Sequence, residues 1–182
     1  MLFLLSPAKS LDYQTPLGAL ADLEHSSVVF ASQTRSLIEV LRGYSPAQIA
    51  ELMDLSDALA ALNVARYQAW SPRYTARNSR QAVLAFNGDV YEGLDAWTLT
   101  PAQLQWAQAH LRILSGLYGV LRPLDRMQPY RLEMGTRLPT ERGRNLYQFW
   151  GPQIAQWLNR QLAADRTPVV IHLASQEDFK AV

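Results

Sequence analysis

The sequence predicts an α/β (or α+β) fold, with a mixed sheet of at least four strands flanked by helices and a long irregular, arginine-rich segment. Short apolar runs that are typical of buried strands alternate with segments that carry helix start signals. The composition, 48% hydrophobic and 18% charged, is that of an ordinary globular chain with enough apolar residues for a core. Between residues 116 and 144, four glycines and three prolines interrupt regular structure.

Four apolar runs are predicted to be buried strands. They cover residues 2–5, 82–86, 111–114 and 168–173. The order of these strands in the sheet is left open.

Three helices are predicted between the strands. Residues 45–48 (Ser-Pro-Ala-Gln) and 100–103 (Thr-Pro-Ala-Gln) each place a hydroxyl at the N-cap, proline at the first helical position and glutamine two residues later, the pattern of a capping box. A third helix is expected over residues 146–162, with its tryptophans packed in the core. Its apolar face consists of Leu146, Trp150, Ile154, Trp157, Leu158 and Leu162.

The length of 182 residues predicts a single domain, 1–182, because no repeat or low-complexity linker divides the chain. No apolar run approaches the ~18 residues that span a bilayer, and no basic segment precedes the first apolar run, so we expect a cytoplasmic protein without a membrane partner. The absence of cysteine excludes disulfides, thiolate zinc sites and iron–sulfur clusters.

The net charge is only +1, but positive charge is concentrated between residues 112 and 144, where seven arginines face three acidic residues. Arginines interleaved with tyrosines favour a polyanion, so DNA is the expected partner. The preference for arginine over lysine among the basic residues follows equally well from a GC-rich genome. The candidate nucleic-acid-binding residues are Arg112, Arg122, Arg126, Tyr130, Arg131, Arg137, Arg142 and Arg144.

Polar residues follow each predicted strand. If the strands are parallel, these residues converge at one edge of the sheet, where open α/β sheets bind ligands, and a small polar anion would suit the mixture of groups. The alternative is that they are ordinary turn residues. The pocket candidates are Ser6, Lys9, Asn87, Asp89, Ser115, Tyr118, Arg122, Ser175 and Glu177.

The sequence contains no standard catalytic or nucleotide-binding motif, and it leaves open whether the protein is an enzyme. His25, His110 and His172 are isolated from one another, so neither a metal site nor a cofactor is predicted. Lys9 is the one group that resembles an amine nucleophile, although anion binding or simple exposure is favoured for it.

Residues 49–67 partly match a helix-hairpin-helix DNA-binding motif. Asp54 and Ser56 stand where that motif has glycines, and Glu51 and Asp57 add negative charge that repels phosphate. A packing corner between two helices is therefore the favoured interpretation.

Several longer strings resemble those of the YaaA family of bacterial peroxide-stress proteins over the whole chain. They are SPAKSLD at 6–12, FNGDVY at 86–91, LSGLYGVLRPLD at 114–125, PYRLEMG at 129–135, LYQFW at 146–150 and LASQE at 173–177. The resemblance implies a cytosolic oxidative-stress protein that limits unincorporated iron. It further implies DNA binding through a positively charged cleft and a helix-hairpin-helix.

The resemblance brings no established reaction with it. Family members extend beyond the point that corresponds to residue 182, so we expect the family fold to include a further C-terminal part. The alternative function is an uncharacterised enzyme that acts on a nucleotide or damaged base in a strand-end pocket containing Lys9.

Overall fold

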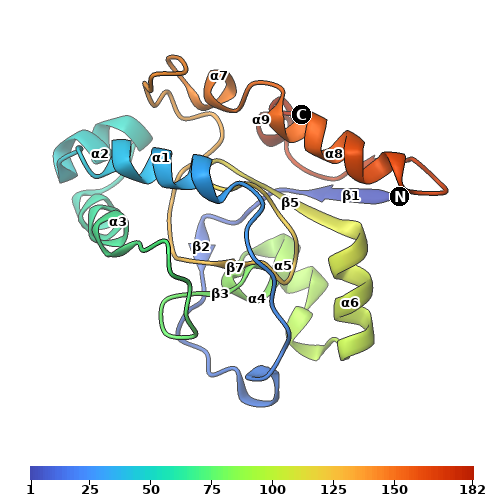
Figure 1. Ribbon diagram of the computed structural model, residues 1–182. Coiled ribbons are helices and arrows are strands. Elements are labelled where there is room, and N and C mark those ends of the chain that lie inside the picture. Colours follow the sequence, from blue (N-terminus) through green and yellow to red (C-terminus); the bar gives the residue numbers. More distant parts are fainter.

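A computed structural model describes residues 1–182, and at its centre lies a four-stranded sheet with the order β6-β5-β1-β8 (Figure 1). β1 (Leu2–Leu5) is parallel to both of its neighbours, β5 (Leu111–Ser115) and β8 (Val170–His172). β6 (Gly119–Leu121) follows β5 in a tight antiparallel pair. The predicted α/β class with a mixed sheet of four strands is confirmed.

Two short antiparallel pairs accompany the main sheet. β2 (Ser10–Leu11) pairs with β4 (Phe86–Asn87), and β3 (Arg80–Gln81) pairs with β7 (Arg126–Met127). These pairs tie the segment after β1 and the irregular segment after β6 to the middle of the chain.

The helices surround this arrangement. They are α1 (Ala31–Leu41), α2 (Pro46–Met53), α3 (Asp57–Ala69), α4 (Ala82–Ala85), α5 (Asp89–Leu94), α6 (Pro101–His110), α7 (Leu146–Trp150), α8 (Gln153–Ala163) and α9 (Gln176–Phe179), with single 3₁₀ turns at Gly18–Leu20 and Ala96–Thr98. α2 and α3 pack against each other beside α1, and in the view of Figure 1 α8 is drawn above β1. None of these helices has the length and apolar character needed to cross a bilayer.

The core is one cluster of 36 buried residues, and its largest fully buried side chains include Trp150, Tyr67 and Tyr118. Five further buried residues form a smaller cluster around Leu104 of α6. The segment 116–144 contributes heavily to the large cluster although, as predicted, it contains only the short strands β6 and β7. Irregular backbone and deep burial therefore coincide in this segment.

Both predicted capping boxes are confirmed. Ser45 accepts a hydrogen bond from the Gln48 amide at 3.3 Å, and the Gln48 side chain accepts one from the Ser45 amide at 2.8 Å. The same reciprocal pair joins Thr100 and Gln103 at the start of α6. The segment 49–67 forms two helices joined by Asp54 in the left-handed conformation (φ 50°), and the Ser56 side chain caps the start of α3.

The strand predicted over residues 82–86 is wrong. Residues 82–85 form the buried helix α4, and Phe86 alone enters a strand, β4. Every residue from Ala82 to Phe86 is buried, so the run has no exposed side. A short apolar run that is buried all round shows neither helical nor strand periodicity, which is why its type was misassigned.

Two other expectations need correction. The predicted strand within residues 168–173 exists as β8, but it is an edge strand and Val170 is 38% exposed. The single helix expected over 146–162 is divided into α7 and α8 because Gly151 has a positive φ of 48° and Pro152 follows it. Trp150 is fully buried as expected, and Trp157 is partly buried against the core.

Candidate functional site

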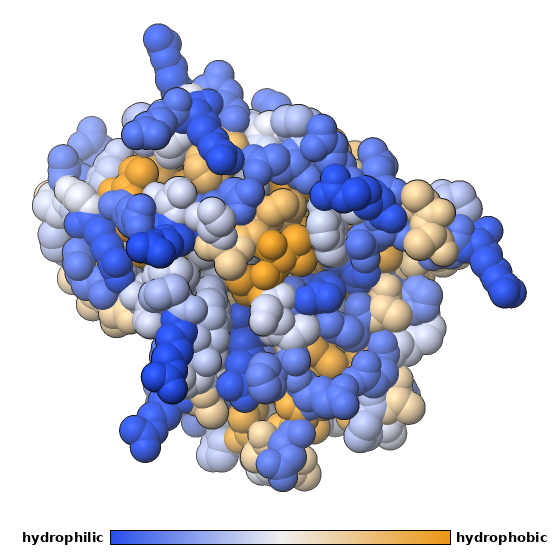
Figure 2. All heavy atoms as spheres, in the orientation of Figure 1, coloured by the Kyte–Doolittle hydropathy of each residue, from blue (hydrophilic) through white to orange (hydrophobic).

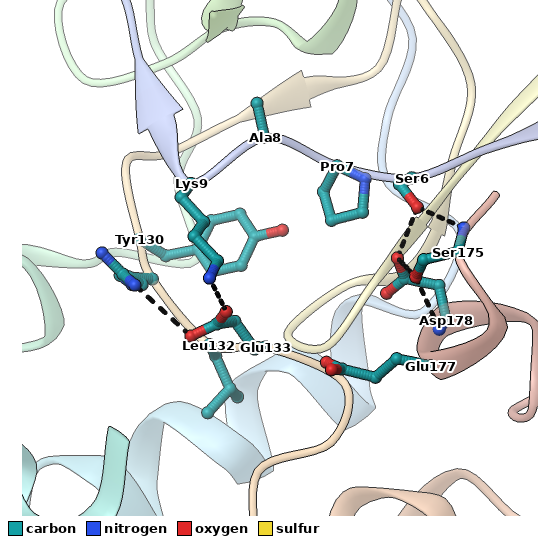
Figure 3. Close-up of a pocket in the computed structure, with 11 residues that line it drawn as sticks. Ser6, Pro7, Ala8, Lys9, Tyr130, Leu132, Glu133, Ser175, Glu177 and Asp178 are labelled. Atoms are coloured by element: carbon teal, nitrogen blue, oxygen red, sulfur yellow. Dashed lines mark hydrogen bonds and ion pairs between the residues drawn. The ribbon is translucent and has the colours of Figure 1, made fainter. Parts of the chain in front are cut away.

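A polar pocket of about 300 Å³ lies at the carboxyl ends of β1 and β8 (Figure 3). We call it the strand-end pocket. It is lined by Ser6, Pro7, Ala8, Lys9, Tyr130, Arg131, Leu132, Glu133, Ser175, Glu177 and Asp178. Its walls thus come from the segment after β1, the irregular segment before α7, and the start of α9.

Parallel pairing brings the two ends of the chain together here. Leu4 is in register with His172, and the Leu173 amide donates to the Leu4 carbonyl at 2.9 Å. Beyond that point, the Ser175 amide donates to Ser6 Oγ at 2.7 Å. The convergence expected of neighbouring parallel strands is therefore realised at β1 and β8.

Asp178 is the most enclosed charged group of the pocket, with 6% of its surface exposed. Its Oδ2 accepts hydrogen bonds from Ser6 Oγ at 2.6 Å and from Ser175 Oγ at 2.8 Å. Burial raises the pKa of Asp178 above its ordinary value, the two hydroxyl donors oppose that rise, and the negative charges of Glu177 and Glu133 add to it. The pocket therefore holds a carboxyl group that protonates more readily than an exposed one.

We expect the free energy of unfolding of Asp178→Asn, measured relative to that of the wild type, to be higher at pH 7 than at pH 3. A carboxyl whose pKa is raised by folding favours the folded state below its unfolded pKa of about 3.9, and that advantage is lost as pH rises through the folded pKa. Urea unfolding of both proteins across this pH range measures the difference. A difference that is independent of pH would contradict the assignment.

The opposite end of the pocket carries an ion-pair network. Lys9 Nζ lies 2.9 Å from Glu133 Oε1, and an Arg131 nitrogen lies 3.4 Å from Glu133 Oε2. Glu177 Oε1 accepts a hydrogen bond from the Gly135 amide at 3.0 Å. Figure 3 shows Lys9 and Glu133 on one side and the Ser6, Ser175 and Asp178 group on the other. Two cations and three carboxylates therefore line one small polar space.

The structure brings four of the nine pocket candidates together, namely Ser6, Lys9, Ser175 and Glu177. Two more lie directly behind the pocket. Ser115 is buried and shares a 2.6 Å hydrogen bond with the hydroxyl of Tyr130, which lines the pocket. Tyr118 is fully buried; its hydroxyl bonds to the backbone of Gln128, and its ring meets that of Tyr130 edge to face.

The other three candidates lie elsewhere. Asn87 pairs with Ser10 in the small β2–β4 sheet, and Asp89 is exposed at the start of α5. Arg122 follows β6 and forms an ion pair with Asp125 at 2.9 Å. The proposed convergence of Asn87, Asp89 and Arg122 with Lys9 and Glu177 is therefore not realised.

The prediction from sequence missed Arg131, Glu133 and Asp178 as pocket residues. For Asp178 a signal was present, because Ser175 and Asp178 have the spacing of a helix cap in which the carboxylate lies close to the capping hydroxyl. Glu133 carried no such local signal, since its role depends on contact with Lys9, which lies 124 residues earlier in the chain.

Four arginines of the 112–144 segment are buried or half-buried in the fold. Arg112 is 4% exposed and donates to the carbonyls of Gln108, Ala109 and Leu111, which closes the end of α6. Its burial, with Arg122 nearby, lowers the pKa of Arg112 to about 10. Arg122 is held by Asp125, Arg126 is half-buried, and Arg131 belongs to the strand-end pocket. Tyr130 is buried as well.

The remaining three arginines are exposed on one loop. Arg137, Arg142 and Arg144 precede α7, and no carboxylate lies within ion-pair distance of any of them. The Arg142 guanidinium lies over the Phe149 ring, 5.1 Å from its centroid. Figure 2 shows hydrophilic side chains projecting from this region of the surface. We call residues 137–144 the basic loop.

Comparison with known proteins decides the family. The model of the family described as peroxide stress protein YaaA matches residues 1–182. This chain belongs to the YaaA family. The chain is 68% identical to a UPF0246 protein of Polaromonas naphthalenivorans and 68% identical to one of Paracidovorax citrulli, in both cases over its whole length. It covers 69% and 70% of those YaaA-family relatives, respectively.

A third YaaA-family relative, the UPF0246 protein Bpet1601 of Bordetella petrii, is 63% identical over the whole chain, which covers 70% of it. The resemblance noted in the sequence is thereby confirmed, and with it a place among peroxide-stress proteins.

Proposed function

We propose that this protein serves the peroxide-stress response in the cytoplasm as a DNA-binding protein, with the basic loop as its phosphate-contacting surface. The observation that carries the proposal is that Arg137, Arg142 and Arg144 are exposed together and lack ionic partners. Guanidinium groups of this kind bind phosphate oxygens in a bidentate way, without reading base sequence.

The backbone of the basic loop is held in place, which favours binding because less freedom is lost on contact. Thr140 and Gly143 exchange two backbone hydrogen bonds, of 2.8 and 3.2 Å. The Arg144 amide donates to Gln148 Oε1 at 2.6 Å. Arg142 and Arg144 therefore extend from a tight, anchored turn.

Replacing Arg137, Arg142 and Arg144 together by glutamine should weaken duplex binding and flatten its salt dependence. Each lost phosphate contact removes about 0.9 from the slope of log affinity against log salt, so the slope should fall by up to about 2.7. Fluorescence anisotropy with two unrelated 20-base-pair duplexes, between about 50 and 200 mM salt, measures both quantities.

The matched control for this experiment is the triple variant Arg73→Gln, Arg160→Gln and Arg166→Gln. All three arginines are exposed and none forms an ion pair, so the control removes the same charge at other places. The proposal fails if the control and the basic-loop variant weaken binding equally, or if the wild type does not bind at 50 mM salt.

We propose further that any limitation of unincorporated iron is indirect. The three histidines do not form a common ligand set. His110 Nδ1 lies 2.9 Å from the Met1 carbonyl, the His172 ring stacks on Phe179, and His25 is exposed in another part of the chain. In the strand-end pocket, Glu133 is paired with Lys9 and Glu177 with the Gly135 amide. A tight iron site needs several free ligands preorganised in one place.

Anaerobic calorimetric titration with ferrous iron should therefore show no stoichiometric binding at micromolar concentrations. One-to-one binding that disappears when Glu133 and Glu177 are both changed to glutamine would contradict this expectation and make the strand-end pocket a metal site.

A second function is favoured by one observation, the juxtaposition of Lys9, Ser6 and the enclosed Asp178 around a single cavity. We propose, as the alternative function, that this pocket takes a small polar ligand such as a nucleotide or damaged base. The ion pair with Glu133 engages the Lys9 ammonium, which argues for binding and against a free amine nucleophile. Native mass spectrometry of the purified protein, with and without Lys9→Met, distinguishes a bound molecule from an empty pocket.

A further inference from the structure

A larger cavity, of about 490 Å³, shares no lining residue with the strand-end pocket or the basic loop and lies against the second half of α3 and the segment that follows it. We call it the arginine pocket. Its lining contains three arginines and no carboxylate, in contrast to the mixed charges of the strand-end pocket. The residues that matter here are Tyr13, Leu62, Arg66, Trp70, Arg77 and Arg80.

Arg66 is the central group. It is half-buried, no carboxylate pairs with it, and its side chain makes one long hydrogen bond, 3.4 Å to Asn63 Oδ1. Burial lowers the pKa of Arg66 below its ordinary value, although tyrosine groups nearby oppose this. A guanidinium that has lost part of its hydration and gained no counter-ion provides a strong site for an anion.

The other two arginines add to this positive charge. Arg77 is exposed and has no hydrogen-bond or ionic partner on its side chain. Arg80 is 8% exposed, donates to the carbonyls of Asp12 and Thr15 at 3.0 and 2.7 Å, and lies 3.5 Å from an Asp12 oxygen. The Asp12 carboxylate, which is not part of the lining, is therefore the single acidic partner of the three arginines in the pocket.

The loop that carries Arg77 is rigidly built. The Thr75 amide donates to Asn78 Oδ1 at 2.8 Å, and the Asn78 amide donates to Thr75 Oγ1 at 3.3 Å. The buried side chain of Gln128 bridges the backbone N–H and C=O of Ser71, at 3.1 and 2.6 Å. The cavity is consequently preformed on this side.

Another part of the lining is apolar. Leu62, Ala65 and Ala69 follow one another along one side of α3, and Leu62 is 45% exposed. Trp70 and Tyr13 complete this part of the lining. An apolar face next to unpaired guanidinium groups matches a ligand that joins a flat ring to a phosphate.

We propose that the arginine pocket binds a mononucleotide, with its phosphate on Arg66 and Arg77 and its base against the Leu62 side of α3. The proposal goes beyond DNA binding by the basic loop and uses none of its residues. The excess of positive charge, the volume of about 490 Å³ and the combination of arginines with apolar residues in the lining all favour a mononucleotide.

Isothermal titration calorimetry with AMP tests the proposal, with adenosine and ribose 5-phosphate as the two half-ligands. AMP should bind more tightly than either half. Arg66→Gln should weaken AMP binding by about tenfold or more, as expected for the loss of charge-assisted hydrogen bonds, whereas Arg160→Gln should leave it unchanged. Ala69→Trp, which fills the cavity from an exposed position, should abolish binding.

The outcomes separate this proposal from the first one. AMP binding that survives the triple basic-loop substitution but not Arg66→Gln or Ala69→Trp supports a distinct nucleotide site, whether or not DNA binds. The proposal is overturned if AMP does not bind, if adenosine or ribose 5-phosphate binds as tightly as AMP, or if a folded Ala69→Trp variant binds AMP normally.

Discussion

Gly116→Ala should destabilise the protein by about 3 kcal/mol or more, or prevent folding. A Cβ at this position would lie 2.2 Å from the Leu132 carbonyl oxygen and 3.1 Å from the Glu133 carbonyl carbon. These are backbone atoms of the segment that forms one wall of the strand-end pocket, so no side-chain rotation relieves the overlap. The Gly116 carbonyl also accepts the Trp150 Nε1 hydrogen bond.

Urea unfolding followed by circular dichroism measures the cost, and Gly93→Ala is its control. Gly93 lies in α5, and a Cβ there would meet nothing within 4 Å. Its replacement should be neutral or stabilise the protein by up to about 1 kcal/mol because alanine favours a helix. Equal midpoints for wild type and Gly116→Ala would show that the 132–133 backbone can move aside.

Trp150→Ala should cost about 3–5 kcal/mol, the range for removing a large aromatic side chain from a core. The indole is fully buried, and its Nε1 donates to the Gly116 carbonyl at 3.0 Å. Its ring centroid lies 5.4 Å from that of Phe30. Gly119, whose φ is 70°, packs so closely on the indole that a Cβ there would lie 2.8 Å from it.

Denaturant unfolding should place Trp150→Phe between the wild type and Trp150→Ala, because phenylalanine keeps part of the packing and loses the hydrogen bond. Trp106→Ala is the matched control, since Trp106 is 54% exposed and should contribute less than about 1 kcal/mol. If Trp106→Ala and Trp150→Ala had similar effects, the core would not depend on this indole in the way its contacts indicate.

The elements with strong local signals were predictable from sequence. Both capping boxes mark helix starts through contacts within four residues, and β1 and β5 are apolar runs inside a sheet. The run 82–86 was not predictable, because burial on every side removes the periodicity that distinguishes a strand from a helix. The break at Gly151 needed recognition that a Gly-Pro pair ends a helix despite continued apolar spacing.

The site was predictable only where strands proved to be parallel neighbours. Ser6 and Ser175 meet because β1 and β8 are adjacent and parallel. The position of Asn87 was predicted wrongly because residues 82–85 before it form a helix and not a strand of the main sheet. The position of Arg122 was predicted wrongly because β6 runs antiparallel to β5 and carries the chain away from that edge of the sheet. Sequence alone also gives no indication that Arg112 donates to helix-end carbonyls while Arg142 is exposed and has no carboxylate partner.

The position of β8 at the edge of the sheet has a consequence for how the molecule opens. β8 pairs with β1 alone, and Val170 and Leu173 are 38% and 59% exposed, so its amide hydrogens should exchange with solvent through smaller fluctuations than those of β5. β8 leads directly to Ser175 and Asp178, whereas the opposite wall of the strand-end pocket contains Tyr130 and Leu132 of the buried core, whose amides should exchange more slowly. Any molecule that contacts both walls would therefore slow amide exchange in the C-terminal segment, because it binds only when that segment is docked and so stabilises the docked state.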